Sequence, residues 1–403
     1  MTQRLAEISR ALVAAGLDGW LFYDFRVSDP IAYRVLGLSE RGITTRRWFC
    51  YVPARGEARA LVSAVESRRL DSLGIERIVY QSSAGMLAGL STILAGARRV
   101  AMNYSPRGAI PYVSRVDAGT VELVRSLGVE IVSAADLIQQ FEATLSAAQM
   151  GGHRRAGAAL GVVVDQTFAE IARRGAAGAS ATEYSIQQFM LERIQRAGLI
   201  TREPPIVAVN AHSADPHFGT AEQNSAPIVS GDFVLLDLWA REPGADAVYA
   251  DITWTGFVGE TVPDYHAEIF AIVRAARDAA VDLVKSRVAA EIPLSGREAD
   301  RAARGVIEHA GFGAEFVHRT GHSIGREVHG MGANLDSLET DDDRRLLDRT
   351  CFSVEPGIYL PGRFGVRSEL DMTIESGSAE VSAPAAQRAI VPIMARSERE
   401  TPR

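Results

Sequence analysis

Cysteine is scarce in this chain of 403 residues, which contains only Cys50 and Cys351. The two lie far apart in the sequence, and each has apolar or aromatic neighbours. Cysteines in such surroundings are usually buried reduced thiols, whereas disulfide frameworks are typical of small secreted domains. We therefore expect a pair of buried thiols.

Long apolar runs and a strong charge of one sign are also absent. No uninterrupted apolar stretch reaches ~18 residues, the length that a membrane-spanning helix needs. The opening residues Met-Thr-Gln-Arg-Leu-Ala-Glu offer no hydrophobic core of a signal peptide. Acidic and basic residues are mixed and the formal net charge is −7, whereas a nucleic-acid partner favours a basic face. The sequence thus predicts a cytoplasmic globular protein without membrane or nucleic-acid partners.

The first third of the chain alternates short apolar runs, bounded by glycine, with helical patterns. This alternation predicts an α/β domain with a mixed sheet over residues 1–140. Its expected helices are 2–16, 64–73 and 84–97, its expected strands are 19–23, 77–81 and 99–103, and a hairpin is expected at 46–63. A further helix and strand are expected between 103 and about 134. No catalytic constellation occurs in this part.

The rest of the chain has an α+β pattern, and we expect a second domain over residues 150–395. A long helix at 137–174, with a break at Gly151-Gly152, contains the domain boundary. Its other expected elements are a helix at 182–197 that begins at Thr182, extended segments at 205–210, 232–240 and 247–258, helices at 263–287 and 295–310, the latter with a Ser295–Glu298 capping box, and a strand-rich region at 314–394.

Metal-ligand residue types gather in three clusters of this second domain. In the first cluster, Asp237 and Asp251 each stand among apolar neighbours on the two strands of a predicted hairpin. A charged carboxylate inside a strand is costly unless a cation or a hydrogen-bond donor compensates it. The hairpin alone is equally consistent with two hydrogen-bonded structural aspartates.

The second cluster is the segment from His318 to His329, which also contains His322 and two glycines. Imidazole is the commonest metal ligand and proton carrier near neutral pH, and glycine lets a backbone approach a site closely. A histidine-rich surface loop would have the same composition.

The third cluster repeats the first, because Glu355 and Glu369 lie on two predicted strands around a Pro-Gly turn. Each carboxylate pair is 14 positions apart in the sequence. The clusters together offer four carboxylates and an imidazole. Four carboxylates balance the charge of two divalent cations, and oxygen-rich sites suit hard or borderline ions such as Mn²⁺ or Co²⁺. A structural zinc site would instead favour cysteines. The three clusters together predict a two-metal site.

The second domain resembles the pita-bread metallopeptidases, the family of prolidase, aminopeptidase P and methionine aminopeptidase. The resemblance rests on the order of the acidic and histidine motifs. They are Asp237, Asp251, His322 in Thr-Gly-His-Ser-Ile-Gly, Glu355 in Glu-Pro-Gly-Ile-Tyr and Glu369 in Gly-Val-Arg-Ser-Glu, with His217, His318 and His329 at the positions of the family's auxiliary histidines. It implies that the first five residues bind two metal ions, Mn or Co with Zn as a third candidate.

The resemblance also implies roles in catalysis. Glu355 would carry the proton of the attacking water to the leaving nitrogen. His217 and His329 would contact the substrate, His318 would lie one layer further out, and Arg367 would orient a carboxylate. The expected substrates are proline-containing dipeptides or short peptides, and the expected assembly is a homodimer.

Residues 1–140 resemble the smaller domain of creatinase, prolidase and aminopeptidase P, which favours an Xaa-Pro dipeptidase over a simple methionine aminopeptidase. The alternatives are an Xaa-Pro aminopeptidase, a metal-free creatinase-type hydrolase and a non-catalytic peptide-binding scaffold. Two features depart from the family pattern. The hairpin tip at 241–246 is three residues longer than usual, which makes Asp246 a rival to Asp251, and Trp254 replaces a common arginine, which we expect to alter substrate preference.

Overall fold

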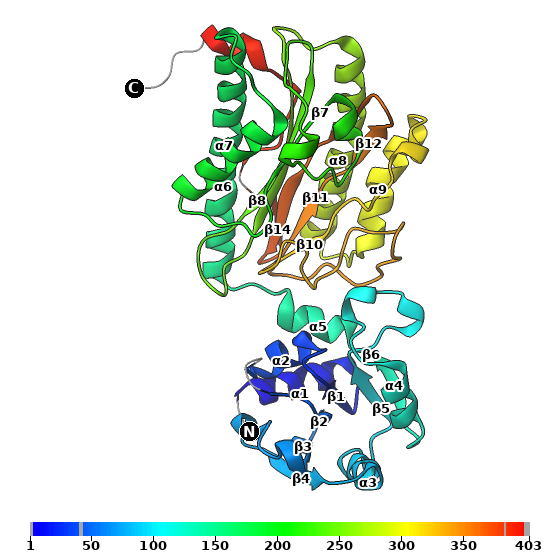
Figure 1. The fold of residues 1–403 in the computed structure, drawn as a ribbon. Coiled ribbons are helices and arrows are strands. Elements are labelled where there is room, and N and C mark those ends of the chain that lie inside the picture. The colour runs from blue at the N-terminus through cyan, green and yellow to red at the C-terminus, as the bar shows by residue number, and fades with distance from the viewer. Residues whose placement is uncertain (1–2, 40–42, 383, 399–403) are drawn as a thin grey trace. The chain divides into compact units, whose positions relative to one another are not determined.

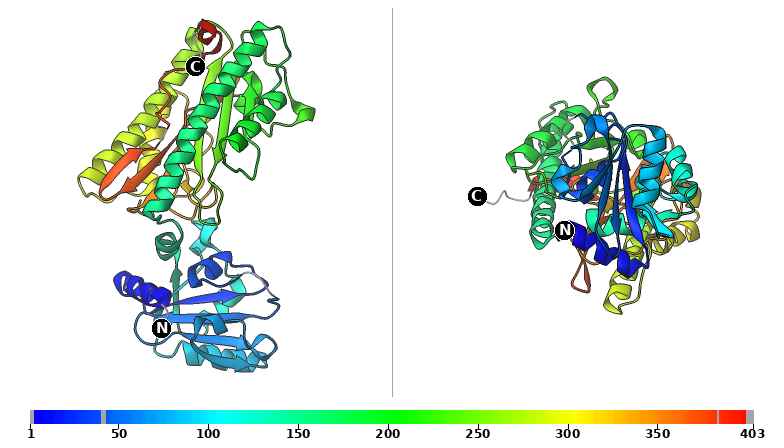
Figure 2. Two further views of the ribbon diagram at one scale, coloured as in Figure 1. Left: turned by 90° about the vertical axis from the view of Figure 1, so that its left-hand side faces the viewer. Right: turned by 90° about the horizontal axis from the view of Figure 1, so that it is seen from below.

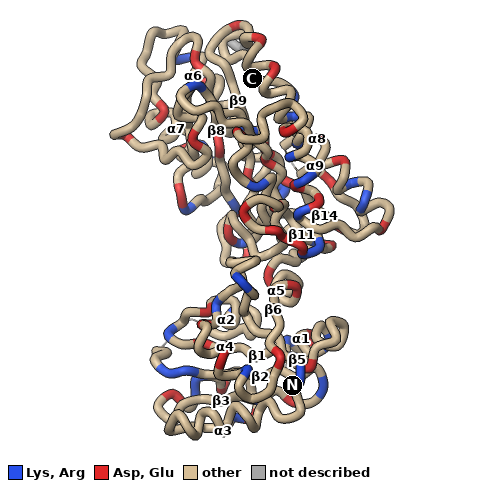
Figure 3. The backbone as a smooth tube through the Cα atoms, turned by 90° about the vertical axis from the view of Figure 1, so that its right-hand side faces the viewer, with Lys and Arg blue, Asp and Glu red and all other residues tan. Residues whose placement is uncertain are grey.

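The computed structural model describes residues 3–39, 43–382 and 384–398, so that Thr2, the first residue of the predicted helix 2–16, lies outside them. The chain divides into two compact units, Met1–Glu142 and Ala143–Arg403 (Figure 1). In the described residues no helix combines the length and the apolar character that crossing a bilayer requires. Acidic and basic residues are interspersed in each unit (Figure 3).

The first unit is built around a six-stranded mixed sheet in the order β4-β3-β2-β1-β5-β6. The central strand β1 pairs antiparallel with β2 and parallel with β5. Apolar side chains such as Leu21, Phe49, Leu61 and Leu90 form the core between the sheet and the helices. The elements are α1 (Gln3–Ala15), β1 (Gly19–Asp24), α2 (Pro30–Leu36), β2 (Trp48–Pro53), β3 (Arg59–Ser63), β4 (Glu76–Tyr80), α3 (Ser83–Ile93), β5 (Arg99–Met102), α4 (Ala118–Arg125), β6 (Glu130–Ser133) and α5 (Ala135–Glu142).

Two details of this unit differ from the sequence prediction. The helix expected at 64–73 is wrong, because the segment forms two short 3₁₀ turns, Ala64–Glu66 and Asp71–Leu73, of which the second ends at Gly74 with φ 61°. The helix α2 was not predicted, although Asp29 caps it and Pro30 occupies its first turn.

The long helix predicted at 137–174 is two helices, α5 and α6 (Ala147–Ala176). The break lies at Ser146, where the backbone N–H of Ser146 donates to Gln149 Oε1 at 2.9 Å and the backbone N–H of Gln149 donates to Ser146 Oγ at 3.3 Å. Such a capping box starts a new helix. The break predicted at Gly151-Gly152 is therefore wrong. Gly152 lies inside α6, where a Cβ atom would come within 3.0 Å of Glu242.

The second unit contains two four-stranded sheets, ordered β16-β9-β8-β7 and β10-β11-β14-β15, and a separate β12–β13 ladder (Figures 1 and 2). Its further elements are α7 (Glu183–Arg196), β7 (Ile206–Val209), β8 (Phe233–Ala240), β9 (Ala250–Phe257), α8 (Asp264–Ala289), α9 (Gly296–His309), β10 (Ser323–Ile324), β11 (Thr350–Val354), β12 (Gly357–Leu360), β13 (Phe364–Arg367), β14 (Leu370–Glu375), β15 (Ser378–Val381) and β16 (Val391–Pro392).

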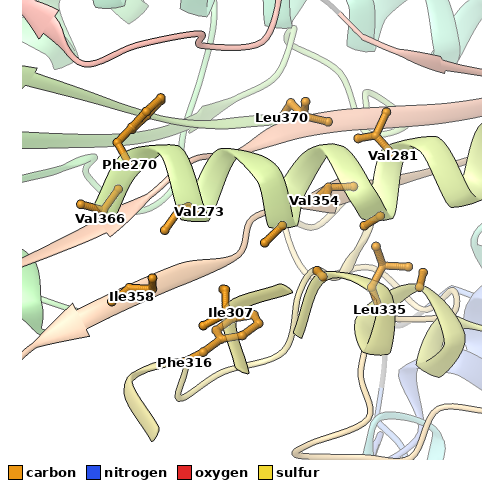
Figure 4. Packing of buried hydrophobic residues seen from close by; sticks show 14 of the residues in the cluster. Phe270, Val273, Val281, Ile307, Phe316, Leu335, Val354, Ile358, Val366 and Leu370 are labelled. Carbon is orange, nitrogen blue, oxygen red and sulfur yellow. The ribbon is translucent and has the colours of Figure 1, made fainter. Parts of the chain in front are cut away.

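Helices cover the sheets on their apolar faces. Helices α6 and α7 share one core with β7, β8 and β9. Helix α8 and helix α9 share the other core with β11 to β14, and Figure 4 shows Phe270, Val273 and Val281 of α8 against Val354 and Leu370. The two sheets meet at β9 and β14, where the backbone N–H of Asp251 donates to the Asp371 carboxylate at 2.9 Å. This junction brings the first and third predicted clusters together.

Candidate metal centre and its cavity

The β8–β9 hairpin presents its two aspartates on one face. Asp237 pairs with Thr253 and Trp239 pairs with Asp251 in the ladder, so these four side chains point to the same side of the sheet. The alternate residues Leu236, Leu238, Ile252 and Trp254 pack in the core with α6 and α7. Trp254 therefore lies on the face away from the site and is not among the residues that line the cavity.

The insertion at the hairpin tip does not supply a site residue. Asp246 is exposed and its carboxylate pairs with Arg326 at 3.1 Å. Asp251 is buried, with 4% of its surface exposed, and lies close to His322 and Glu369. Of the two candidates, only Asp251 points toward the other acidic residues of the site.

Glu355 and Glu369 lie in a gap between two ladders rather than inside strands as predicted. Val354 pairs with Leu370 on one side of the gap and Gly357 pairs with Arg367 on the other, so the two glutamates face each other across it. Pro356, which has no backbone N–H to donate, occupies this gap. The equal spacing of 14 residues thus hides two different arrangements, because Asp237 faces Thr253 and not Asp251.

His322 is held by its backbone and by one ring nitrogen. Its N–H donates to Ser353 Oγ at 2.9 Å, and its Nδ1–H donates to the Ser323 carbonyl at 3.2 Å. The approach needs the preceding glycine, since a Cβ on Gly321 would lie 2.0 Å from the Ser353 carbonyl oxygen. The other ring nitrogen, Nε2, lies 3.6 Å from Asp251 Oδ2 and 3.3 Å from Glu355 Oε1. Burial lowers the pKa of His322 to about 3, so its ring is neutral and Nε2 offers a lone pair.

Three ligand-type residues, Asp251, His322 and Glu369, place one ligand atom each within 4.8 Å of one another, and all three are buried. Burial raises the pKa of Asp251 and of Glu369 well above their ordinary values, and repulsion from the neighbouring carboxylates raises both pKa values further. Asp251 Oδ1 is a buried oxygen with no hydrogen-bond partner among the described residues. A buried acidic cluster with an orphaned oxygen fits divalent cations, which would supply the missing positive charge.

Arg367 connects the two hairpins. Its Nη2 pairs with Asp237, its Nε–H donates to Thr253 Oγ1 at 2.9 Å, and its Nη1–H donates to the Tyr359 hydroxyl at 3.1 Å. Thr253 Oγ1–H in turn donates to Glu369 Oε2 at 2.7 Å. The guanidinium therefore holds one site carboxylate directly and another through a threonine.

The auxiliary histidines have different surroundings. His318 Nδ1–H donates to the Arg319 carbonyl at 2.6 Å, and its Nε2 accepts from the Tyr359 hydroxyl at 2.7 Å. Burial lowers the pKa of His318 to about 4, which keeps the ring neutral in this chain of hydrogen bonds. His329 lies edge-on to His322 with ring centroids 4.4 Å apart, and His217 lies on the exposed loop before Phe218.

The site residues line one cavity of about 470 Å³. All nine residues singled out in the sequence line it, namely Asp237, Asp251, His322, Glu355, Glu369, His217, His318, His329 and Arg367. Apolar and aromatic side chains line it as well, including Trp239 and Tyr249. The arrangement offers a cation-binding cluster, neutral imidazoles and a bound guanidinium in one concave space.

Several supporting residues were not found from the sequence. Thr253 and Tyr359 carry the hydroxyls that bridge the charged groups, and Asp371 fixes the backbone of Asp251. The spacing offered one clue, since Thr253 and Asp371 each stand two residues after a predicted ligand. Trp239 offered the same clue, two residues after Asp237.

Comparisons with known proteins identify relatives of this chain. Residues 151–376 match the family model described as metallopeptidase family M24. The chain is 31% identical over 273 residues to the probable dipeptidase PepE of Mycobacterium tuberculosis, which covers 67% of each protein. It is 34% identical over 177 residues, 44% of each protein, to the Xaa-Pro dipeptidase of Lactobacillus helveticus.

The fold agrees with that of a solved structure over almost the whole chain. The crystal structure of dipeptidase PepE from Mycobacterium ulcerans superposes with a TM-score of 0.70 and 27% identity, covering 96% of this chain and 97% of that one. The predicted fold class, a pita-bread domain preceded by a smaller α/β domain, is confirmed. The matched family model spans more than half of the chain and contains every residue that forms the acidic cluster. The chain belongs to metallopeptidase family M24.

Proposed function

We propose that this metallopeptidase hydrolyses the peptide bond before proline in dipeptides. The observation that carries the proposal is the convergence of Asp237, Asp251, His322, Glu355 and Glu369 on one cavity. The names of its relatives, probable dipeptidase and Xaa-Pro dipeptidase, support the substrate class. The intact acidic set speaks against a metal-free hydrolase and against a non-catalytic scaffold.

Those five residues would hold two divalent cations. Mn²⁺ and Co²⁺ are the favoured ions, and Zn²⁺ is the third candidate. When bound, such ions lower the pKa of a water molecule and polarise the scissile carbonyl. Thr253 and Arg367 fix Glu369 and Asp237 by hydrogen bonds before any cation arrives, so the donor atoms need little rearrangement. A prearranged set of ligands reduces the ordering that binding requires.

Glu355 is the proton carrier in this proposal. Ser353 Oγ–H donates to Glu355 Oε1 at 3.0 Å, and the backbone N–H of Glu355 donates to the Thr320 carbonyl at 2.7 Å. These two contacts orient the carboxylate while Arg367 Nε lies 4.0 Å from its other oxygen. From this position Glu355 takes the proton of the attacking water and gives it to the prolyl nitrogen, which leaves as an amine.

The histidines divide between substrate contact and support. We assign substrate contact to His217 and His329, which both line the cavity. Within the described part of the chain, their ring nitrogens have no hydrogen bonds like those of His318. His318 holds Tyr359, and Tyr359 accepts from Arg367. This assignment makes His318 a positioning residue.

The test uses the purified chain after chelation, with Mn²⁺, Co²⁺ or Zn²⁺ added back separately. X-Pro dipeptides and X-Pro-Y tripeptides are offered in parallel. Faster turnover of X-Pro supports a dipeptidase. Faster turnover of X-Pro-Y supports the alternative, an Xaa-Pro aminopeptidase, and a relative from Mycoplasma pneumoniae is named "Putative Xaa-Pro aminopeptidase". Turnover of neither by any metal form would overturn the proposal.

The remaining assignments are a cytoplasmic location and a homodimer that binds neither membrane nor nucleic acid. Light scattering coupled to size-exclusion chromatography tests the dimer. A monomer at micromolar concentration would overturn that part alone.

A further inference from the structure

The wall of the cavity beside Asp251 is apolar. Trp239 is directly opposite Asp251 in the β8–β9 ladder and two residues after Asp237, so its indole lies on the face that carries both aspartates. Tyr249 and Val328 pack with Trp239 in one hydrophobic cluster, and Ile206 of β7 also lines the cavity. We call Trp239, Tyr249, Val328 and Ile206 the aromatic wall.

The aromatic wall is held in place by the backbone. The backbone N–H of Tyr249 donates to the Gly325 carbonyl at 3.0 Å, and the guanidinium of Arg241 lies over the Tyr249 ring at 5.3 Å from its centroid. Tyr249 is almost fully buried, with 2% of its surface exposed. A rigid aromatic surface beside a reacting centre binds an apolar group with little loss of conformational freedom.

Carboxylates border the aromatic wall. Glu203 lies three residues before Ile206, and Glu327 lies directly before Val328. Both glutamates are exposed and line the same cavity. Glu327 pairs with Arg202 at 2.9 Å, which links the two segments. The carboxylate of Glu203 has no hydrogen-bond or ion-pair partner in the described part of the chain. An apolar surface with a negative edge complements an apolar side chain next to an ammonium group.

We propose that the aromatic wall binds the side chain of the substrate's N-terminal residue, that this residue is apolar, and that Glu203 receives its free ammonium group. The inference rests on the proposed X-Pro hydrolysis and specifies its substrate. Trp239 is the specificity-determining residue, because it is the wall residue that neighbours both aspartates on the hairpin, opposite Asp251 and two residues after Asp237. One methylene in such a pocket changes kcat/KM by about 10- to 200-fold.

The first experiment compares Leu-Pro with Gly-Pro in the Mn²⁺-loaded full chain. We expect the wild-type kcat/KM for Leu-Pro to exceed that for Gly-Pro by at least about tenfold. Trp239→Ala should reduce this selectivity ratio by about tenfold or more, and Trp239→Phe by less. Trp254→Phe is the matched control, since Trp254 is on the same hairpin but faces the core, and it should leave the ratio unchanged.

A second wall variant guards against misfolding or metal loss in Trp239→Ala. Val328→Thr keeps the shape of the side chain and replaces one methyl group with a hydroxyl group, so it should also lower the ratio. Metal content by atomic emission spectroscopy and the thermal midpoint are measured for every variant. The inference would be overturned if both variants, Trp239→Ala and Val328→Thr, had full metal content and the wild-type ratio of kcat/KM for Leu-Pro to kcat/KM for Gly-Pro.

The ammonium contact is tested with 4-methylpentanoyl-proline, which is Leu-Pro without its amino group, as a competitive inhibitor. Wild-type protein should bind Leu-Pro more tightly than this analogue, and Glu203→Gln should narrow the difference. A difference unchanged in Glu203→Gln would remove Glu203 from the inference. Hydrolysis of X-Pro dipeptides with no apolar preference would overturn the inference alone, whereas no hydrolysis of any X-Pro dipeptide would overturn the proposed function with it.

Discussion

Among the carboxylates of the site, Glu355 is held in the manner expected of a proton carrier. Asp237 pairs with the guanidinium of Arg367 and Glu369 accepts from the Thr253 hydroxyl, whereas Glu355 accepts from the Ser353 hydroxyl and lies 4.0 Å from Arg367 Nε. Glu355 thus has an oriented carboxylate at the cavity, and a proton carrier must have such a fixed position.

Glu355→Gln should lower kcat for X-Pro dipeptides by roughly 10²–10⁴-fold, because the amide keeps the shape of the side chain but cannot accept the proton of water. Steady-state kinetics with added Mn²⁺ measures the effect. A thermal midpoint close to wild type excludes collapse of the structure as its cause. Turnover near the wild-type rate would mean that the proton follows another route.

His322→Ala and His318→Ala should differ in metal content. His322 Nε2 faces Asp251 and Glu355, so its loss removes a ligand atom. His318 Nε2 is engaged by Tyr359, and removing such a supporting contact typically costs ~10–100-fold in activity or affinity. Titration with Mn²⁺ by calorimetry measures both variants. Equal affinity in the two would contradict the ligand assignment.

At the scale of the elements, Asp300 of α9 ties together the loops that lead into the site. Its buried carboxylate accepts from Thr320 N–H at 2.9 Å, from Ser337 N–H at 3.1 Å and from Arg304 Nε–H at 3.0 Å. Burial acts to raise the pKa of Asp300, but the bonds from Arg304, Ser337 and Thr320 outweigh it and the pKa is lowered. The segment that carries His318 and His322 is therefore anchored to a helix.

Asp300→Ala should destabilise the fold by roughly 3–5 kcal/mol, because it leaves Arg304 buried without its partner. A lowered pKa means that the ionised Asp300 stabilises the folded state above its unfolded pKa, and that this stability is lost as pH falls through the folded pKa. The difference in thermal midpoint between wild type and variant should thus be large at pH 7 and shrink below about pH 4.

Melts for this comparison use chelated protein, so that acid release of metal does not contribute. Asp341→Ala is the control, since Asp341 forms exposed ion pairs with Arg297 and Arg301 and should cost about 1 kcal/mol or less. Equal losses in the two variants would contradict the anchoring role of Asp300.

The elements also show what the sequence reveals and what it conceals. The Asp237–Asp251 hairpin and the helix start at Thr182 follow from local patterns of apolar, polar and capping residues, and the structure contains both. The break at Ser146 was missed because Ser146 and Gln149 form a capping box inside an otherwise helical pattern. Local sequence does not distinguish a helix that continues through Ser146 from one that ends and restarts there, since tertiary packing decides between them.

Register is the other quantity that the local pattern did not provide. The positions of Glu355 and Glu369 suggested two strand residues, but only the pairing of β11 with β14 and of β12 with β13 shows that they face each other in a gap. Likewise, the contact of Asp371 with the backbone of Asp251 joins positions 120 residues apart. Such long-range contacts follow from the sheet arrangement and not from neighbouring residues.

At the scale of the whole molecule, the nine candidate site residues all belong to the unit Ala143–Arg403. Binding of Mn²⁺ should therefore slow amide hydrogen exchange in β8, β9, β11 and β14, by mass action on the folded state. The strands β1, β2 and β5 of the other unit, which have their own core, should change little. Exchange measured by mass spectrometry on the full chain, with and without EDTA, checks this. Equal protection of both units would contradict a site confined to one.

The four tryptophans of the chain divide evenly between the units, and this distribution makes the protein its own optical probe. Trp20 and Trp48 are buried in the first unit, while Trp239 faces the cavity and Trp254 faces the core. In Trp254→Phe, the only indole of residues 143–403 stands beside the acidic cluster. Its fluorescence would then report on the arrival of a paramagnetic ion or of a peptide, against a constant emission from the two indoles of the other unit.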